Sequence, residues 1–435
     1  MKNKIDNFEL NKSNKFISIF SFFFIVLYFF YGFLTNENAA GAGGYNGDFN
    51  HIWNNLNLFK TGIFINLDNI EYTDSRFPFS YIFHIYLNPF IETKLGLRLS
   101  VFVLSALVPV LFFLCIRENY KKNNLETILL ISSLILLSPY FRTSSYWGLG
   151  ENYSLIFLCL SYLFFVHFKK NYILNTKLKN NLLILFVCFC SSLCVYFDQK
   201  FLIVPLVCYF SLLNLKIEKI YKLSATVYFI ILSFPCLYLV YIWGAILPPD
   251  AANHRITKTI HLYNFGYSLS ILAFYIFPFL LTKKMKFKNF LDVFFKKNNL
   301  ITFLFFGVYL ISLIFFDNFE NLTVLGKGIF HKLFLFVVTD SFYRLILTLI
   351  TFFFSLIIIL IYFEKKIDYL IISYFLLISL FIYPFMQEYL DPLILVLIFT
   401  FLKTKIKINY KNSFILTLFF TTFLLGTKVY YGIIL

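Results

Sequence analysis

The chain of 435 residues is 60% hydrophobic and 22% aromatic, and only 14% of its residues are charged. An average soluble protein is about one quarter charged, and so few charges cannot cover a water-soluble surface. The composition therefore excludes a soluble enzyme, a disordered protein and a nucleic-acid-binding protein. The formal net charge of +16 has to be divided between the two sides of a membrane before it has a meaning.

Long apolar runs separated by short polar clusters predict an all-α, polytopic membrane protein with about 11–13 spans, each needing roughly 20 residues. No linker or internal repeat divides the sequence, so we expect one integral membrane domain over residues 1–435. The expected spans are at about 16–34, 99–116, 125–139, 151–167, 181–197, 201–214, 223–244, 266–282, 299–316, 343–363, 367–384, 390–402 and 413–431.

Basic residues predict the orientation of the spans. The N-terminal tail and alternate loops hold 26 of the 38 lysines and arginines. The positive-inside rule places this side, and with it the N-terminus, in the cytoplasm. The other side holds 14 of the 22 acids and five of the six histidines. We therefore expect the titratable chemistry on the outer side.

The first apolar run has two interpretations. It follows basic residues and precedes a small-residue stretch at 40–42, as in a signal peptide. A signal-peptide apolar core is only ~7–15 residues long, whereas this run has the length of a full span. We therefore expect an uncleaved membrane anchor.

The first outer loop, residues 35–98, is the longest one, and it contains an amphipathic pattern. Helical spacing of its apolar residues predicts a helix in the membrane interface. These residues are Phe49, Ile52, Trp53, Leu56 and Phe59. Asp48 directly precedes them and is either an N-cap or a functional carboxylate. The two roles are compatible, because a helix N-terminus keeps a carboxylate ionised.

Two further charged positions each have two interpretations. Asp74 and Arg76 flank a turn fixed by proline, and form either a surface pair or an arginine that faces a phosphate. Glu151 opens a span in the second outer loop, near Arg142. It is either an interfacial anchor or the second acid of a site, since ionisable groups at membrane depth are functional by default.

The later outer loops supply cations and acids. His254, Arg255 and His261 suit an anionic headgroup, or decorate a loop. Lys327 adds a cation, and Glu388 lies in a short turn where a solvated acid needs no function. Nothing on the cytoplasmic side matches the Gly-x-x-x-x-Gly-Lys-Ser/Thr phosphate loop of nucleotide-binding proteins.

Several motifs together resemble the GT-C glycosyltransferases, polytopic enzymes that use lipid-linked sugar donors. They are Gly47-Asp48-Phe49-Asn50-His51, Arg76-Phe77-Pro78 and Leu97-Arg98, in a first outer loop that follows an N-terminal anchor. Within that superfamily, the residues at 48–51, 248–261 and 387–392 are similar to the dolichyl-phosphate-glucose α-1,2-glucosyltransferases and their bacterial relatives.

The resemblance implies a multi-pass bacterial plasma-membrane enzyme with interfacial helices in its first outer loop. It would move a hexose or pentose, with inversion, from a polyprenyl-phosphate donor to a glycan, lipid or protein acceptor outside. Asp48 would be the general base and Glu151 would orient the acceptor or support the base. Substrate contacts would come from His51, Asp74, Arg76, Arg142, His254, Arg255, His261, Lys327 and Glu388, with the cations at the leaving phosphate.

The resemblance implies no nucleotide cofactor. Many members have a paired Asp-Glu or Asp-Asp in this loop, whereas Phe49 follows Asp48 here, so the sequence does not support a divalent metal cofactor. Two other functions remain as alternatives. A polysaccharide polymerase or ligase predicts a large, arginine-rich outer loop late in the chain. A lipid-linked-sugar flippase or transporter predicts broken spans and charges deep in the bundle.

Overall fold

The computed structural model describes residues 2–40, 44–255, 260–280, 299–316, 326–363, 365–402, 406 and 408–434, and of residues 2–12, 254–255, 299–305, 316 and 432–434 it describes the backbone only. Within these ranges the regular structure is helical and contains no β-strand, which confirms an all-α protein. The chain forms two compact units, residues 1–253, 399–401 and 408–435 (unit 1) and residues 254–398 and 402–407 (unit 2). That the whole chain is one domain stays a prediction.

The prediction of a multi-pass membrane protein is confirmed. Within the described ranges seven helices are long and apolar enough to cross a membrane, and a bent helix pair makes up to eight. The seven are Ser13–Leu34, Lys94–Asn119, Glu151–Asn171, Lys177–Phe197, Lys219–Trp243, Ser341–Tyr362 and Tyr410–Tyr431. Shorter apolar helices of 10–17 residues include Gln199–Leu213, Asn264–Leu280, Phe306–Phe315 and Gly328–Val337.

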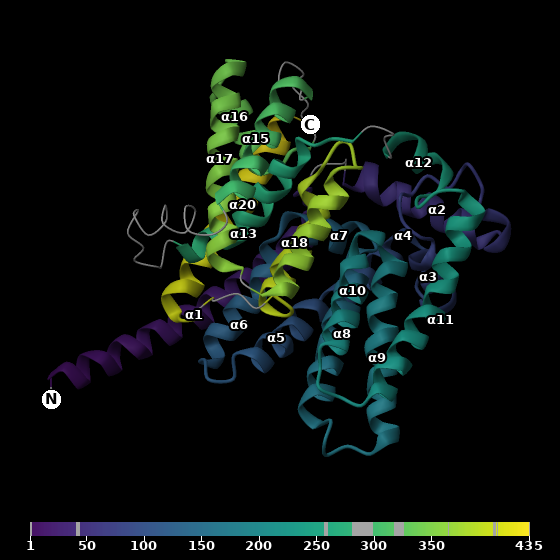
Figure 1. Ribbon diagram of the computed structural model, residues 1–435, viewed down its shortest axis with the longest axis horizontal. Helices are drawn as coiled ribbons and strands as arrows, with labels where there is room; N and C mark the ends of the chain where they lie inside the picture. Colours follow the sequence, from purple (N-terminus) through teal and green to yellow (C-terminus); the bar gives the residue numbers. More distant parts are fainter. Residues whose placement is uncertain are drawn as a thin grey trace. The chain divides into compact units, whose positions relative to one another are not determined.

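Unit 1 contains the candidate site and is built from helices of both chain ends (Figure 1). Its elements are α1 (Lys2–Leu34), η1 (Tyr45–Phe49), α2 (Asn50–Lys60), η2 (Phe64–Asn66), α3 (Phe79–Leu87), α4 (Lys94–Ser105), α5 (Leu107–Asn119), α6 (Leu125–Ser133), η3 (Leu134–Leu137), α7 (Pro139–Trp147), α8 (Glu151–Asn171), α9 (Lys177–Phe197), η4 (Gln199–Leu202), α10 (Ile203–Leu213), α11 (Lys219–Trp243) and α20 (Tyr410–Ile434). The short α12 (Pro249–Arg255) runs across the boundary between the units.

The helices α8, α9 and α11 lie side by side, and α5 packs on α8 (Figure 1). Cysteines contribute to the packing in this region. Cys159, Cys188 and Cys194 are fully buried free thiols. At one end, the Nζ of Lys170 forms an ion pair with Glu118, which holds the last turn of α8 against the last turn of α5.

The amphipathic helix expected after Asp48 is α2, and most of its apolar face is buried against protein. Phe59 is 1% exposed, and its ring centroid lies 5.0 Å from that of Tyr72 and 5.6 Å from that of Tyr81. The N-cap interpretation of Asp48 is wrong. Asp48 lies inside the π-helical turn η1, and no side chain caps η1 or α2.

The second outer loop expected at 138–152 is mostly a helix. The chain bends by 68° between Leu125–Leu137 and Pro139–Trp147. Ser138 caps the new helix by accepting a hydrogen bond from the Phe141 amide, and Pro139 occupies its first turn. All nine residues of α7 are buried inside the protein.

Arg142 of α7 belongs to a buried ion-pair group, which we call the Arg142 cluster. Its Nε lies 2.7 Å from Glu37 Oε1, and Lys428 Nζ of α20 lies 3.1 Å from Glu37 Oε2. Burial alone would raise the pKa of Glu37, but hydrogen bonds and charge from Arg142 and Lys428 hold it below its ordinary value. The cluster therefore joins α7 and α20 to the segment after α1.

Unit 2 contains a second set of packed helices. In it α13 packs on α16, α17 and α18, and α15 packs on α17. Its elements are α13 (Asn264–Leu280), α15 (Asn299–Phe316), α16 (Gly328–Val337), α17 (Ser341–Tyr362), α18 (Lys366–Ser379), η5 (Gln387–Tyr389) and most of α19 (Leu393–Phe399).

Gly32 allows the close approach of α1 to the Arg142 cluster, and this predicts the effect of a small substitution. A Cβ at Gly32 would lie 2.3 Å from Arg142 Nη2 and 2.8 Å from Glu37 Oε2. We expect Gly32→Ala to destabilise the protein by about 1–3 kcal/mol through overpacking. The measurement is the melting temperature of the purified protein in detergent.

Gly426→Ala is the matched control, because a Cβ at this helical glycine of α20 meets nothing within 4 Å. Its melting temperature should equal or exceed that of the wild type, since alanine is favoured over glycine in a helix by about 1 kcal/mol. Equal melting temperatures for the two variants would contradict the packing described for Gly32.

Candidate functional site

Arg76 is paired with three carboxylates, one from its own turn and two from distant parts of the chain. Its Nη1 lies 3.3 Å from Asp74 Oδ1, its Nη2 lies 3.0 Å from Glu151 Oε1, and its Nε lies 3.3 Å from Asp198 Oδ2. A second cation, Lys200, has its Nζ 2.6 Å from Glu151 Oε1 and 3.6 Å from Asp198 Oδ2. We call these five residues the Arg76 cluster.

The cluster forms where three segments meet. Asp74 and Arg76 lie in the turn that precedes α3, and Glu151 is the first residue of α8. Asp198 ends α9, and its side chain accepts a hydrogen bond from the Lys200 amide to cap η4. Gly150 permits this junction, because a Cβ there would lie only 2.9 Å from the Phe197 carbonyl oxygen.

The Arg76 cluster is shielded from solvent but not closed. The side chains of Asp74 and Glu151 are each 3% exposed, whereas that of Arg76 is 16% exposed. Glu151 has a further partner, since the Ser144 hydroxyl donates to its Oε2 at 3.0 Å. Buried charges must be paired to be tolerated, and removing one partner leaves the others uncompensated. Glu151 is thus held by two cations and a hydroxyl.

Asp74 is ionised at neutral pH. Its burial alone would raise its pKa, but the charge of Arg76 and a 2.6 Å hydrogen bond from the Tyr81 hydroxyl lower it below the ordinary value. The Tyr72 hydroxyl donates to the Arg76 carbonyl oxygen and so closes the same turn. Both tyrosines pack against Phe59 of α2, so the turn is fixed to the amphipathic helix.

His51 connects α2 to the Arg76 cluster. Its Nδ1 lies 3.2 Å from Thr73 Oγ1, and its Nε2 lies 3.2 Å from Asn55 Nδ2. Thr73 directly precedes Asp74. Of the predicted site residues, the structure therefore brings together His51, Asp74, Arg76 and Glu151.

Asp48 lies one helical turn before His51, in the turn Tyr45–Phe49, and it is partly exposed. Two cations of α4 contact the surroundings of this turn. Lys94 Nζ lies 2.8 Å from Asn50 Oδ1 and 5.9 Å from the centroid of the Tyr45 ring. Arg98, one turn further along α4, packs over the Trp147 ring at 4.5 Å.

The surroundings of Arg98 complete this region. Its Nε donates to the Tyr146 carbonyl oxygen at 3.2 Å, and its Nη2 donates to the Phe33 carbonyl oxygen at 2.8 Å. The Trp147 ring beneath it also contacts Tyr45 and Phe49 of η1, at centroid distances of 6.1 and 6.4 Å. The Asp48 turn is therefore supported by the ends of α1, α4 and α7.

The other predicted residues lie elsewhere. Arg142 is fully buried in the Arg142 cluster, where its Nη1 and Nη2 also donate to backbone carbonyls. In unit 2, His261 contacts the Tyr263 hydroxyl at 2.8 Å and Lys327 Nζ lies 5.5 Å from the Tyr267 ring centroid, while Glu388 lies in η5. The side chains of His254 and Arg255 lie outside the described residues.

Sequence reasoning missed Lys94, Asp198 and Lys200. Asp198 and Lys200 sit in a gap of three residues between two expected spans. A gap so short leaves a charged side chain close to the bundle, and this is the signal that could have found them. Lys94 and Arg98 have the i, i+4 spacing of neighbours on one helix face.

The ion pairs join loops that are predicted to lie on the same side of the membrane. Lys15–Glu126 and Lys170–Glu118 join loops expected on the basic side. The Arg76 cluster joins three loops expected on the opposite side. Among the described residues, no three His, Cys, Asp or Glu side chains are arranged to hold a metal ion.

Comparisons of the chain with protein-family models, with curated proteins and with solved structures gave no match. The function is therefore argued from the residues and their geometry.

Arg76→Gln tests whether the cluster holds the first outer loop. The substitution leaves three buried carboxylates with one cation, Lys200. We therefore expect it to lower the free energy of unfolding by about 3–5 kcal/mol. Limited proteolysis of the purified protein should then cleave within residues 44–98 faster than in the wild type. Glu92→Gln is the control on the same loop, because its ion pair with Lys60 is exposed and contributes less than about 1 kcal/mol. Equal cleavage rates in both variants would contradict this role.

The lowered pKa of Asp74 predicts a pH dependence with a definite sign. A carboxyl whose folded-state pKa is depressed stabilises the fold above its unfolded pKa of about 3.9, and this contribution is lost as the pH falls through the folded value. The difference in melting temperature between wild type and Asp74→Asn should therefore be largest near pH 7 and shrink below about pH 4. A difference that grows on acidification would contradict the prediction.

Proposed function

We propose that the chain is a membrane glycosyltransferase of the GT-C type. It moves a sugar from a polyprenyl-phosphate donor to a glycan, lipid or protein acceptor on the outer side of the membrane. The observation that carries the proposal is the position of Asp48, a partly exposed residue in the turn before α2, where Lys94 contacts Asn50, on a loop that the Arg76 cluster fixes to the spans.

The proposed reaction needs a base and an anion-stabilising group at one place. The acceptor hydroxyl attacks the anomeric carbon, Asp48 takes its proton, and the bond from that carbon to the phosphate oxygen breaks with inversion. Asp48 suits the role, because it lies in the first turn of a helical stretch where the helix dipole keeps a carboxylate ionised.

The leaving group is a lipid phosphate whose developing charge needs a cation. Lys94 is one candidate, since its ammonium contacts Asn50, two residues after Asp48, and the residue is partly exposed. Arg76 has some exposed surface and is a second candidate. Arg142 is less suited, because it is fully buried as well as bound to Glu37.

Glu151 has a positioning role in this proposal. With Arg76 at 3.0 Å and Lys200 at 2.6 Å, it holds the turn before α3 on the end of α8. Both oxygens of Glu151 already have partners, since the Ser144 hydroxyl donates to the second one, and its side chain is only 3% exposed, so an acceptor hydroxyl does not reach it. Asp48 is therefore the better base.

A second candidate function is the transport of a lipid-linked sugar. The observation that favours it is the break between α6–η3 and α7, bent by 68° and lined by the buried Arg142 cluster. Broken helices beside buried charges are common in transporters. Transport predicts movement of the intact donor across a vesicle membrane, whereas transfer predicts a new glycosidic bond.

Asp48→Asn is the decisive variant. We expect it to keep the wild-type melting temperature and membrane insertion, and to lower sugar transfer by at least about a hundredfold, the usual contribution of a general base. The measurement is the incorporation of label from radioactive polyprenyl-phosphate sugars into product, in purified protein reconstituted in liposomes.

Asp68→Asn is the matched control, because Asp68 is an exposed acid of the same loop. It should transfer sugar at the wild-type rate. Wild-type turnover by Asp48→Asn would show that Asp48 is not the base. If the wild-type protein moves the donor across the liposome membrane and forms no labelled product, the transporter function would be correct and the transferase function wrong.

A further inference from the structure

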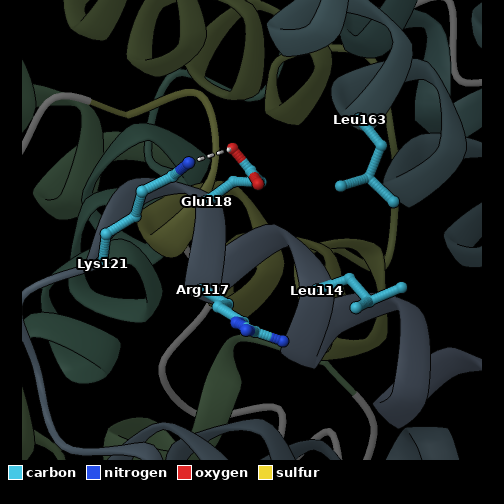
Figure 2. A pocket seen from close by; sticks show the side chains of 5 residues that line it. All are labelled: Leu114, Arg117, Glu118, Lys121 and Leu163. Atoms are coloured by element: carbon cyan, nitrogen blue, oxygen red, sulfur yellow. Dashed lines mark ion pairs between the residues drawn. The ribbon is translucent and has the colours of Figure 1, made fainter.

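We infer that unit 1 has a binding pocket for an anionic phospholipid at the basic end of α5 and α8. A pocket of ≈ 450 Å³ opens there, within the range of about 300–1,000 Å³ that is typical of small-ligand sites. It is lined by Leu114, Arg117, Glu118, Lys121 and Leu163 (Figure 2).

The polar lining of the pocket has an excess of positive charge. Its one acid, Glu118, is paired with Lys121 at 3.6 Å and with Lys170 of α8. The guanidinium of Arg117 has no ion pair or side-chain hydrogen bond to the part of the chain that the structure describes. Figure 2 shows the Glu118–Lys121 ion pair on one side of the pocket and Arg117 away from it. Arg117 is therefore available to a ligand.

The apolar lining points to a lipid. Leu114 lies one turn before Arg117 in α5, and it is 38% exposed. Leu163 lies seven residues before Lys170 in α8, roughly 10 Å deeper along the helix at 1.5 Å per residue. A phosphate held by Arg117 would therefore have its acyl chains beside leucines of two candidate spans.

The location of the pocket selects the headgroup. Arg117 is near the end of the span Lys94–Asn119, and Lys170 is near the end of Glu151–Asn171, so the basic groups lie at the membrane boundary. Basic pockets at such a boundary bind anionic headgroups. A zwitterionic headgroup carries an ammonium, which Arg117 and Lys121 would repel. The ligand class is thus a phospholipid with net negative charge, and the inference does not depend on the proposed transferase activity.

The experiment measures lipid retention by the full-length protein. The protein is placed in nanodiscs with equal amounts of phosphatidylglycerol and phosphatidylcholine, released into detergent, and its bound lipids are counted by native mass spectrometry. We expect phosphatidylglycerol to be enriched on the wild type. Arg117→Gln should reduce this enrichment by about tenfold, the effect of losing one charge-assisted contact.

Lys179→Gln is the control for a general loss of positive charge. Lys179 is exposed in the first turn of α9, also among the loops expected on the basic side, and does not line the pocket. It should retain phosphatidylglycerol as the wild type does. If Arg117→Gln does not fold, Arg117→Lys preserves the charge without the planar fork and should retain an intermediate amount.

Three results would overturn the inference. They are equal retention of the two lipids by the wild type, unchanged retention in Arg117→Gln and Arg117→Lys, and an equal loss in Lys179→Gln. Displacement of the lipid by inorganic phosphate at the same concentration would also overturn it, because the leucines would then contribute nothing.

Discussion

The guanidinium of Arg76 and the three carboxylates around it form the interaction on which the candidate site depends. In a setting with few charges, each buried ion must be paired by groups that the fold brings to it. Asp74 is a near neighbour in sequence, but Glu151 and Asp198 come from the ends of two different helices. The first outer loop is therefore attached to the spans by charge as well as by apolar packing.

The position of Asp48 follows from this attachment through a short series of contacts. Thr73, next to Asp74, contacts His51 of α2, and Asp48 lies three residues before His51. On its other side the turn is supported by Trp147, whose ring lies beneath Arg98. The general base has to be held to within a fraction of an ångström of its position against the acceptor hydroxyl. The proposed chemistry therefore requires a rigid loop.

Local patterns explain which parts of the structure were predictable. Apolar runs specify helices through hydropathy alone, and α2 follows from its spacing of apolar residues. Individual candidates such as Asp74, Arg76 and Glu151 were also identifiable, because charges are rare in this chain. The contacts between the members of the cluster could not be predicted. Arg76 and Asp198 are 122 positions apart, and no local sequence pattern indicates that they meet.

Contacts between residues that are distant in sequence also explain why the structure differs from the prediction at Arg142 and at residues 138–152. Arg142 is predicted to face a phosphate, but its guanidinium is bound instead by Glu37, a residue from near one end of the chain that also pairs with Lys428 from near the other end. The segment 138–152 was expected to be a loop because its residues are polar. Inside the bundle its serines instead bond to the backbone and to Glu151, as the bonds from Ser145 to the Phe141 carbonyl and from Ser144 to Glu151 show.

The ion pair between Glu118 and Lys170 also indicates the route of the chain between them. Because these two side chains meet, the last turns of α5 and α8 lie at one level, and residues 120–150 run from this level to the far end of α8, which at 21 residues is about 32 Å long. That length matches the hydrocarbon thickness of a bilayer, about 30 Å. The segment that contains the bent pair α6–η3 and α7 therefore connects the level of one end of α8 to the level of its other end.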